Sequence, residues 1–203
     1  MKAKVESRKN KIYRIEKRII DVLLSSLSLV VMSPVFIVIS IGVKLSGSGP
    51  VIYQQWRVGF AGQLFTYRKF RTMTSDASEL GTGPIFKLKN DPRITPFGRF
   101  LRMTALDELP AFLSVLKGEM SIVGPRAPLP LEVNHYSEEQ RKRLEAKPGL
   151  TGYWQTFGRE RGISDLNQII EMDLEYLRKQ SLWLDLKIIG KTFWMSLSSK
   201  GAY

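Results

Sequence analysis

The chain has 203 residues, of which 43% are hydrophobic and 25% charged, and its formal net charge is +12. It has no cysteine and one histidine, His135, which excludes disulfides, thiolate metal sites and a cysteine nucleophile and makes a Ser–His–Asp triad or a histidine metal centre a poor fit. Any acid, base or nucleophile should therefore be a carboxylate, and the positive charge predicts an anionic partner: nucleic acid, an acidic membrane or a phosphorylated substrate.

Residues 1–45 have the pattern of a basic N-terminus followed by a membrane segment. The apolar run from Ile19 to Leu45 exceeds the roughly 20 residues that span a bilayer. It is also too long for the apolar region of a signal peptide and is not followed by a typical cleavage site. Ser33-Pro34 lies near its middle, where the proline removes one helical hydrogen bond.

This break leaves two alternatives, a kinked helix that spans the membrane or a re-entrant hairpin that enters and returns. Basic residues precede the run, and Lys44, Arg57 and Arg68 follow it, with no acidic residue between Asp21 and Asp76. The positive-inside rule then keeps both ends in the cytoplasm. The charge pattern therefore favours the hairpin, with two arms of about 14 residues each.

Residues 46–203 are predicted to form a cytoplasmic catalytic domain at the membrane interface, and the fold class is α+β and mostly helical. Residues 51–58 and 63–73 flank the turn at 59–62 and predict a small β-hairpin. Alternation along a strand places Lys69 and Arg71 on one face, which is either a binding surface or a solvated edge. A surface loop is expected over residues 74–92.

Helix starts are predicted from capping residues followed by an apolar pattern. The last helix carries Trp183, Phe193 and Trp194 beside two lysines, which is typical of an amphipathic helix on a membrane surface. Packing of this helix into the core is the open alternative. The predicted N-caps are Thr95 (with Pro96), Ser137 (with Gln140), Ser164 and Ser181.

Asp107 and Glu108 are the most suggestive pair of carboxylates. Pro110 must lie in the first turn of its helix, so this helix should begin near Asp107 and end at Gly118. A carboxylate at a helix N-terminus is stabilised in its ionised form and could attack phosphorus or hold Mg²⁺. Spacing alone favours a simpler interpretation, because Thr104-x-x-Asp107 is a capping-box pattern.

Arg126 follows a short apolar stretch and lies in the Gly/Pro-rich turn of residues 121–128. A rigid turn beside an arginine suits a bidentate grip on phosphate, and it equally suits a structural turn. The sequence has neither a Walker A loop nor a GxGxxG fingerprint, so a nucleotide would have to be held by another device.

Taken together, these landmarks resemble the bacterial sugar transferase family, the monotopic phosphoglycosyl transferases, from about residue 12 to 198. Each motif is weak alone, but their number and order are specific. The matching segments include Ser33-Pro34, Lys69-Phe-Arg-Thr-Met73, Asp91-Pro-Arg-Ile-Thr-Pro-Phe-Gly-Arg99, Leu106-Asp-Glu-Leu-Pro110, Leu116-Lys-Gly-Glu-Met-Ser-Ile-Val-Gly-Pro-Arg126, Lys147-Pro-Gly-Leu-Thr-Gly152 and Gly158-Arg159.

The resemblance implies transfer of a sugar-1-phosphate from a UDP-sugar to a polyprenyl phosphate such as undecaprenyl phosphate, with release of UMP. It implies a Mg²⁺ requirement, membrane-lipid contacts, and a location at the cytoplasmic face of the bacterial inner membrane, where surface glycan synthesis begins. It also implies a re-entrant membrane helix broken at Ser33-Pro34, in agreement with the charge pattern. A homodimer is left open.

The resemblance also assigns roles to individual residues. Asp107 is the expected nucleophile toward the sugar-bearing phosphorus and forms a covalent phosphosugar intermediate, and Glu108 assists as base or metal partner. Both carboxylates are the candidate Mg²⁺ ligands. The expected phosphate- and substrate-binding residues are Arg102 and Arg126, supported by Arg57 and Lys69, with Asp173 as a weaker candidate for metal or nucleotide support.

The chain departs from the family pattern at Ala127, where proline is usual, and over residues 153–157. Both departures lie near the expected nucleotide and sugar pocket, so the identity of the sugar stays open. Two other classes of function compete: a membrane-tethered binder of nucleic acid or anionic lipid, and a scaffold without catalysis. The binder gives Asp107 no special role, and the presence of Asp107-Glu108, Arg102 and Arg126 argues against the scaffold. We therefore expect an enzyme that binds no nucleic acid.

Overall fold

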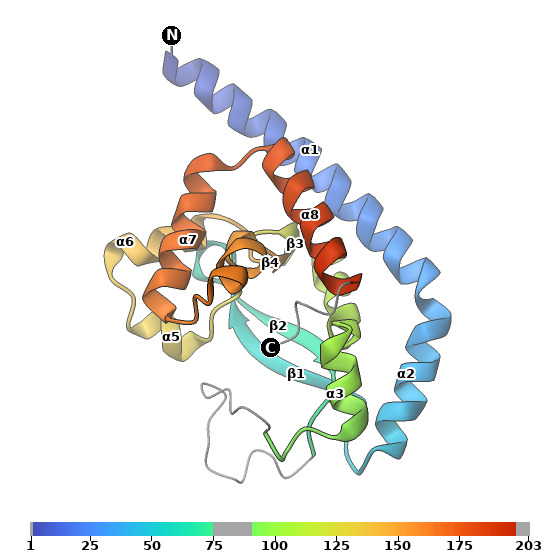
Figure 1. Cartoon of the computed structure of the whole chain (residues 1–203). Helices are drawn as coiled ribbons and strands as arrows, with labels where there is room; N and C mark the ends of the chain where they lie inside the picture. The colour runs from blue at the N-terminus through green and yellow to red at the C-terminus, as the bar shows by residue number, and fades with distance from the viewer. Residues whose placement is uncertain (1, 75–90, 198–203) are drawn as a thin grey trace.

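Figure 1 shows the computed structural model of the chain, which describes residues 2–74 and 91–197, with the side chains of residues 11–74 and 91–196. A long, bent pair of N-terminal helices runs along one side of a domain built of short helices and two small sheets. The predicted mostly helical α+β class is therefore confirmed. The loop expected at residues 74–92 lies mostly outside the described residues.

The N-terminal pair consists of α1 (Lys2–Val31) and α2 (Ser33–Leu45). No single helix in the described ranges is long and apolar enough to cross a membrane, but Lys11–Val31 and Ser33–Leu45 together are, with a bend of 62° between them. The Ser33 hydroxyl donates to the carbonyl of Val30 at 2.8 Å. This is the carbonyl that Pro34 leaves without a helical partner, so the predicted break is confirmed together with its local cause.

The middle of α1 packs against the domain. The Arg18 guanidinium donates to the carbonyls of Val115 and Leu116 at 2.6 and 2.7 Å, at the C-terminal end of another helix, α4 (Phe112–Lys117). The buried Asp21 carboxylate accepts hydrogen bonds from the Ser121 hydroxyl at 3.0 Å and the Ile122 N–H at 2.8 Å. Asp21 therefore interrupts the apolar run because it faces protein.

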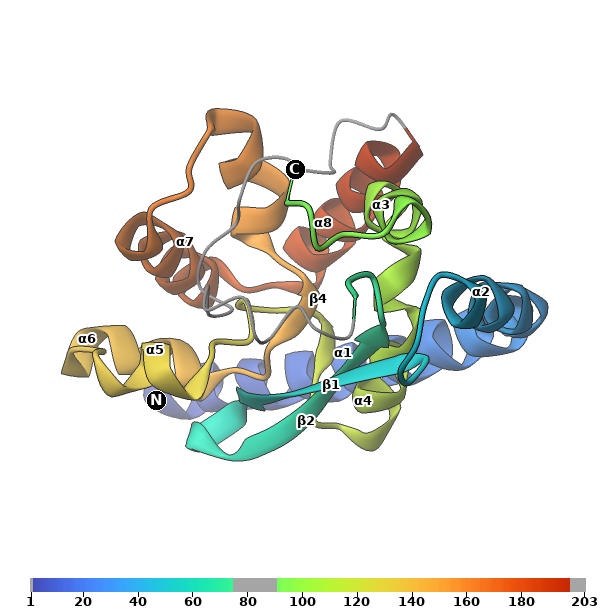
Figure 2. The same cartoon turned by 90° about the horizontal axis from the view of Figure 1, so that it is seen from below.

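Strands β1 (Ile52–Val58) and β2 (Leu64–Phe70) form the predicted antiparallel hairpin, with Val58 opposite Leu64 and Ile52 opposite Phe70. The turn between them contains Ala61 and Gly62 at φ of 53° and 79°. Figure 2 shows the two strands as a long ribbon beneath the rest of the domain. One face of this ribbon carries the side chains that later form the site.

Arg71 explains why β2 ends before the predicted residue 73. Its buried guanidinium turns toward the C-terminal end of α2 and donates to the carbonyls of Val43 at 2.8 Å, Gly47 at 2.7 Å and Ser48. These carbonyls lack helical partners, and a cation there also complements the helix dipole. Arg71 thus holds α2 to the hairpin. Lys69, which was predicted to share a face with Arg71, lies near Asp107 instead.

Three short helices follow the hairpin. Helix α3 (Pro96–Met103) is capped by Thr95, whose hydroxyl accepts the Gly98 N–H at 2.9 Å, as predicted. A 3₁₀ helix, η3 (Leu106–Ala111), then leads into α4, which ends at Gly118 with φ of 82°. The predicted start near Asp107 and stop at Gly118 are confirmed, but the first turn is 3₁₀ rather than α.

The second half of the chain contains α5 (Pro130–Asn134), α6 (Glu138–Arg141) and α7 (Leu166–Lys179). The Ser137–Gln140 capping box before α6 is confirmed. The prediction that Ser164 caps α7 is wrong by one residue, because the Asp165 carboxylate accepts from two N–H groups of the first turn. Strands β3 (Ser121–Val123) and β4 (Gly149–Thr151) pair in parallel and were not predicted.

The last helix, α8 (Leu182–Leu197), packs partly into the core, and its predicted place on a membrane surface stays a prediction. Ile188 and Met195 are buried in the domain, whereas Trp183 and Trp194 are 77% and 71% exposed. Eleven residues correspond to about three full turns, so the two tryptophans lie on one face. The helix therefore packs into the core on one side and presents aromatic side chains on the other.

Gly98 marks a close contact between α3 and the chain just after β2. A Cβ atom at this position would lie 2.1 Å from the carbonyl oxygen of Thr72. We expect Gly98→Ala to lower the free energy of unfolding by about 1–3 kcal/mol through overpacking, as measured by chemical denaturation. Gly190→Ala is the control, since a Cβ there meets nothing within 4 Å; equal stability of the two variants would contradict the prediction.

Candidate active site

Asp107 lies in η3 where this helix packs against β2, and it is only 6% exposed. The turn before it contains Ala105 at φ of 55°, a left-handed conformation that costs a non-glycine residue about 1 kcal/mol. Burial raises the pKa of the Asp107 carboxyl, while Lys69 and Arg102 oppose this shift. Asp107 is thus a desolvated carboxylate with two cations near it.

The capping interpretation of Asp107 is wrong. The N-cap position of η3 is Ala105, which has no side chain able to cap. The Thr104 hydroxyl points back along the chain and donates to the carbonyl of Phe100 at 2.9 Å in α3. Thr104-x-x-Asp107 therefore ends one helix instead of starting the next, and the Asp107 carboxylate is left for another role.

The two cations beside Asp107 come from separate elements. Lys69 is the penultimate residue of β2; burial lowers its pKa, and Asp107 is the largest opposing influence. Arg102 lies in the last turn of α3, and its Nε donates to the Thr72 hydroxyl at 2.9 Å. Thr72 thereby fixes one edge of the Arg102 guanidinium.

Tyr67 joins this group and was not predicted. Burial raises its pKa well above the ordinary tyrosine value, and the Glu108 and Asp107 carboxylates raise it further. Tyr67 lies two residues before Lys69 on the same face of β2, and the Arg57 guanidinium lies 5.8 Å from its ring centroid. Strand alternation from Lys69 was the signal that could have identified it.

Arg57 and Arg126 form a second cationic cluster along the same face. Burial lowers the pKa of Arg57, with Arg126 as the next cause, so the two guanidinium groups are close enough to repel. Arg57 donates to the carbonyl of Ala127 at 2.8 Å. Arg126 donates through Nη1 to both oxygens of Glu132, at 3.1 and 3.0 Å, and sequence reasoning missed this glutamate.

Asp173 lies apart from the group around Asp107 and contacts the backbone of Arg126. Its buried carboxylate pairs with Arg143 and accepts the backbone N–H of Arg126 at 3.3 Å. Burial raises its pKa to about 6, against the influence of Arg143. The structure therefore places Asp173 behind the Arg126 backbone, while Lys69, Arg102 and Glu108 are placed around Asp107.

Among the residues that the structure describes, Asp107 and Glu108 are the candidate Mg²⁺ ligands at this site. Within residues 2–74 and 91–197, no three His, Asp or Glu side chains converge as a metal cage. Mg²⁺ commonly binds one or two carboxylates and completes its shell with water and substrate phosphates. Asp107 and Glu108 therefore fit an ion that arrives with a phosphorylated substrate.

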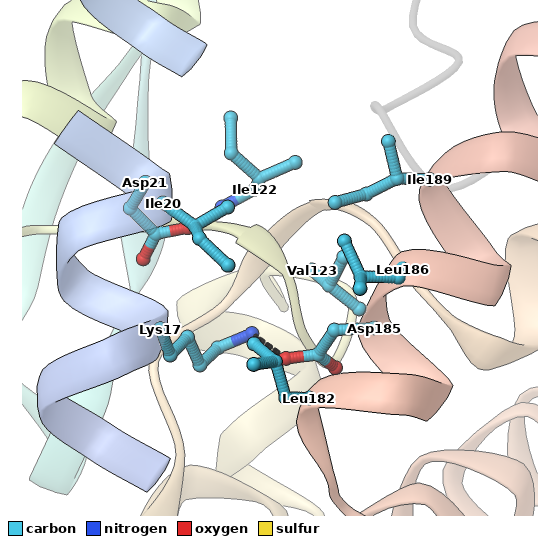
Figure 3. A pocket seen from close by; sticks show the side chains of 9 residues that line it. All are labelled: Lys17, Ile20, Asp21, Ile122, Val123, Leu182, Asp185, Leu186 and Ile189. Atoms are coloured by element: carbon cyan, nitrogen blue, oxygen red, sulfur yellow. Dashed lines mark hydrogen bonds and ion pairs between the residues drawn. The ribbon is translucent and has the colours of Figure 1, made fainter. Parts of the chain in front are cut away.

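A small cavity elsewhere in the fold is separate from this site. Figure 3 shows it between α1, β3 and α8, lined by Lys17, Asp21, Asp185 and apolar side chains. It offers roughly the room of one water molecule. Lys17 pairs with Asp185 at 2.6 Å across it, so this region serves to join α1 to α8.

The segment that departs from the family pattern forms a π-helix, Trp154–Gly158. Gly158 is required there, because a Cβ atom would lie 2.4 Å from Trp154. The rings of Tyr153 and Phe157 pack at a centroid distance of 5.0 Å. Single π-turns are frequent at functional sites, and the place of this segment near the substrate pocket stays a prediction.

The charges around Asp107 predict how the acidic limb of the profile of kcat/KM against pH should shift when a neighbouring cation is replaced. If the Asp107 carboxylate must be ionised, kcat/KM should fall with decreasing pH around an apparent pKa above that of an ordinary aspartate. Lys69 lowers the pKa of Asp107, so Lys69→Met should move this limb to higher pH as well as lower the activity. Profiles from about pH 4 to about pH 8 measure the shift. Arg99→Met, at an exposed position of α3, is the control; a limb that moves equally in both variants would argue against the assignment.

A buried carboxylate between a lysine and an arginine is chemically suited to act on an anionic phosphoryl group. The family model described as bacterial sugar transferase matches residues 12–199 of the chain. The chain belongs to the bacterial sugar transferase family.

Three relatives give this family context. The chain is 42% identical over 203 residues to the undecaprenyl-phosphate galactose phosphotransferase of Salmonella typhimurium, covering 94% of this chain and 42% of the relative. It is 42% identical over 201 residues to the UDP-glucose:undecaprenyl-phosphate glucose-1-phosphate transferase of Escherichia coli, covering 94% and 42%. It is 39% identical over 201 residues to the exopolysaccharide production protein ExoY of Rhizobium meliloti, covering 92% and 88%. The chain thus spans less than half of the first two and most of the third.

Proposed function

We propose that this protein transfers a sugar-1-phosphate from a UDP-sugar to a polyprenyl phosphate, such as undecaprenyl phosphate, and releases UMP. The observation that carries the proposal is the desolvated Asp107 carboxylate beside Lys69 and Arg102. The names of the Salmonella and Escherichia relatives support the lipid acceptor, and the latter also supports a UDP-sugar donor. The reaction would be the first membrane step of surface glycan synthesis.

The first half-reaction uses Asp107 as nucleophile. A carboxylate oxygen attacks the sugar-bearing β-phosphorus, and the bond from that phosphorus to the bridging oxygen breaks. The bond electrons leave with UMP, and the sugar phosphate stays on Asp107 as an acyl phosphate. Lys69 and Arg102 offset the negative charge of the phosphoryl oxygens during this displacement.

The second half-reaction regenerates the carboxylate. An oxygen of the polyprenyl phosphate attacks the same phosphorus, and the bond to Asp107 breaks. The product is a polyprenyl diphosphate sugar. Splitting the transfer in this way lets one site serve a soluble donor and then a membrane-embedded acceptor. Asp107 and Glu108 would hold Mg²⁺, which neutralises phosphate charge and polarises phosphoryl oxygens when it is bound.

Arg57 and Arg126 extend the cationic surface away from Asp107. Phe65, opposite Arg57, and Lys69 are four residues apart on β2, which corresponds to about 14 Å along the strand. The long side chain of Arg57 closes this gap, because its guanidinium lies 5.8 Å from the Tyr67 ring centroid and its charge lowers the pKa of Lys69. The two cationic clusters therefore adjoin, as the two linked phosphates of one nucleotide diphosphate require. We assign the cluster near Asp107 to the reacting phosphate and the cluster at Arg126 to the remaining nucleotide phosphate.

The helix pair supplies the membrane attachment in this proposal. Arg18 and Asp21, before the bend, contact α4 and β3. Ile39 and Val43, after the bend, are buried against the domain, and Arg71 binds the end of α2. Both ends of the apolar segment are tied to the same domain, which supports a bend that returns the chain to the side from which it entered. The exposed tryptophans of α8 are suited to the headgroup region.

The experiment is UMP release by the purified protein in nanodiscs, with undecaprenyl phosphate, Mg²⁺ and a panel of UDP-sugars. Multiple turnovers that require both the lipid and one particular sugar would support the proposal and identify the donor. Without the lipid, release should stop at about one UMP per protein, because the first half-reaction leaves the sugar phosphate on Asp107. Repeated turnover without the lipid would indicate a hydrolase. If no UDP-sugar yields UMP although circular dichroism shows that the protein is folded, the transferase proposal fails and the scaffold alternative is favoured.

A further inference from the structure

We propose that Arg143 and Asp173 are positioning residues that hold the backbone of Arg126, so that its guanidinium stays aligned with the nucleotide phosphate. This inference rests on the proposed function, because it gives Arg126 a phosphate to bind. It replaces the earlier expectation that Asp173 itself supports the metal or the nucleotide.

Asp173 and Arg143 each form a hydrogen bond to the backbone of Arg126, one to its N–H and the other to its carbonyl. The Arg126 N–H donates to Asp173 Oδ2 at 3.3 Å, and the Arg126 carbonyl accepts from Arg143 Nη2 at 3.0 Å. The same Nη2 pairs with Asp173 Oδ2, which closes the arrangement. Arg143 Nη1 donates to the Tyr136 hydroxyl at 2.7 Å, so the guanidinium itself cannot rotate freely.

The participating residues come from separate parts of the chain. Asp173 lies in α7, Arg143 in the 3₁₀ helix Lys142–Glu145, and Tyr136 just after α5. Arg126 lies in the loop after β3, between Pro125 and Pro128, which restrict its backbone further. Two packed helices thus contact one residue of a loop, and Tyr136 holds Arg143 from a third part of the chain.

The burial of the pair argues for a geometric role. Arg143 and Asp173 are each only 1% exposed. Burying two charges carries a desolvation cost that often equals or exceeds their attraction, so apolar side chains of similar volume could stabilise the fold equally well. What apolar side chains could not do is bind both peptide groups of Arg126.

The Arg126 side chain is left with a free edge. Within the described part of the chain, its side-chain hydrogen bonds all leave from Nη1, toward Glu132. The Nε and Nη2 groups remain for a phosphate, and a guanidinium binds phosphate best through two parallel N–H groups. Glu132 thus fixes the rotamer of the Arg126 side chain, while Arg143 and Asp173 fix the position of the Arg126 backbone.

A double-mutant cycle tests this role through two readouts: kcat/KM for the UDP-sugar, and UMP affinity by calorimetry. Arg143→Met should lower both by about 10- to 100-fold, the range expected for a misplaced binding group. In an Arg126→Ala background, the same change should have almost no further effect. Lys17→Met, which breaks the partly buried pair with Asp185 at α1, is the matched control and should act additively with Arg126→Ala.

Thermal unfolding of each variant separates loss of fold from loss of alignment. Should Arg143→Met not fold, Tyr136→Phe removes only the hydroxyl partner of Arg143 and should give a smaller loss with the same non-additivity. The proposal would be overturned if Arg143→Met lowered kcat/KM and UMP affinity equally in the wild-type and Arg126→Ala backgrounds. It would also be overturned if Arg143→Met kept wild-type affinity and activity. If the wild type releases no UMP but the variants still lower UMP affinity non-additively, the positioning role holds and the transferase assignment fails.

Discussion

Replacing Asp107 with asparagine is expected to lower UMP release about a thousandfold or more, because the amide cannot form the acyl phosphate through which the reaction proceeds. The same variant should give no covalent adduct. With UDP-sugar present and polyprenyl phosphate omitted, wild-type protein should gain the mass of one sugar phosphate, and Asp107→Asn should not. Intact-protein mass spectrometry after rapid acid quenching makes this measurement.

Two further variants show whether the effect belongs to Asp107. Glu108→Gln should lower the rate but still accumulate the adduct, because the nucleophile remains. Asp165→Asn is the control for loss of a carboxylate, since asparagine caps a helix as well as aspartate does and Asp165 lies at the exposed start of α7. An adduct in Asp107→Asn would assign the nucleophile elsewhere. Loss of the adduct in Glu108→Gln would show that the first half-reaction already requires Glu108.

The features that could be predicted from the sequence depend on neighbouring residues. The Thr95 cap, the hairpin around residues 59–62 and the break at Ser33-Pro34 each involve groups within four positions of one another. Turn and cap chemistry determines them before any tertiary contact forms. The family resemblance then drew attention to Asp107, which spacing alone would have treated as a cap.

The features that could not be predicted depend on partners far along the chain. Arg71 binds the end of α2, and Asp21 binds β3, 100 residues away from it. Asp173 resembles a site carboxylate in sequence, yet its partner is Arg143, 30 residues earlier. Charged side chains of this kind look alike in a sequence, whether they bind a substrate or satisfy backbone groups inside the fold. Strands β3 and β4 are three residues each, too short for alternation to be recognised.

The cysteine-free chain allows a direct measurement of which side of the membrane each end of the helix pair occupies. We expect single cysteines introduced as Lys11→Cys and Gln54→Cys, both at exposed positions, to react with a membrane-impermeant maleimide from the cytoplasmic side only. Val31→Cys, at the bend, should stay protected from both sides because its exposed apolar surroundings would lie in the lipid. A spanning helix would instead expose Lys11→Cys and Gln54→Cys on opposite sides.

Pro34→Ala distinguishes two causes of this topology. If the proline break alone returned the chain, the variant should form a longer straight helix and place the two cysteines on opposite sides. We expect the labelling to stay on one side. The Arg18 and Asp21 contacts before the bend and the Arg71 contacts after it hold both arms to the same folded domain. The basic residues at both ends oppose translocation as well. The proline would then shape the apex of the hairpin, whereas the domain and the flanking charges determine its direction.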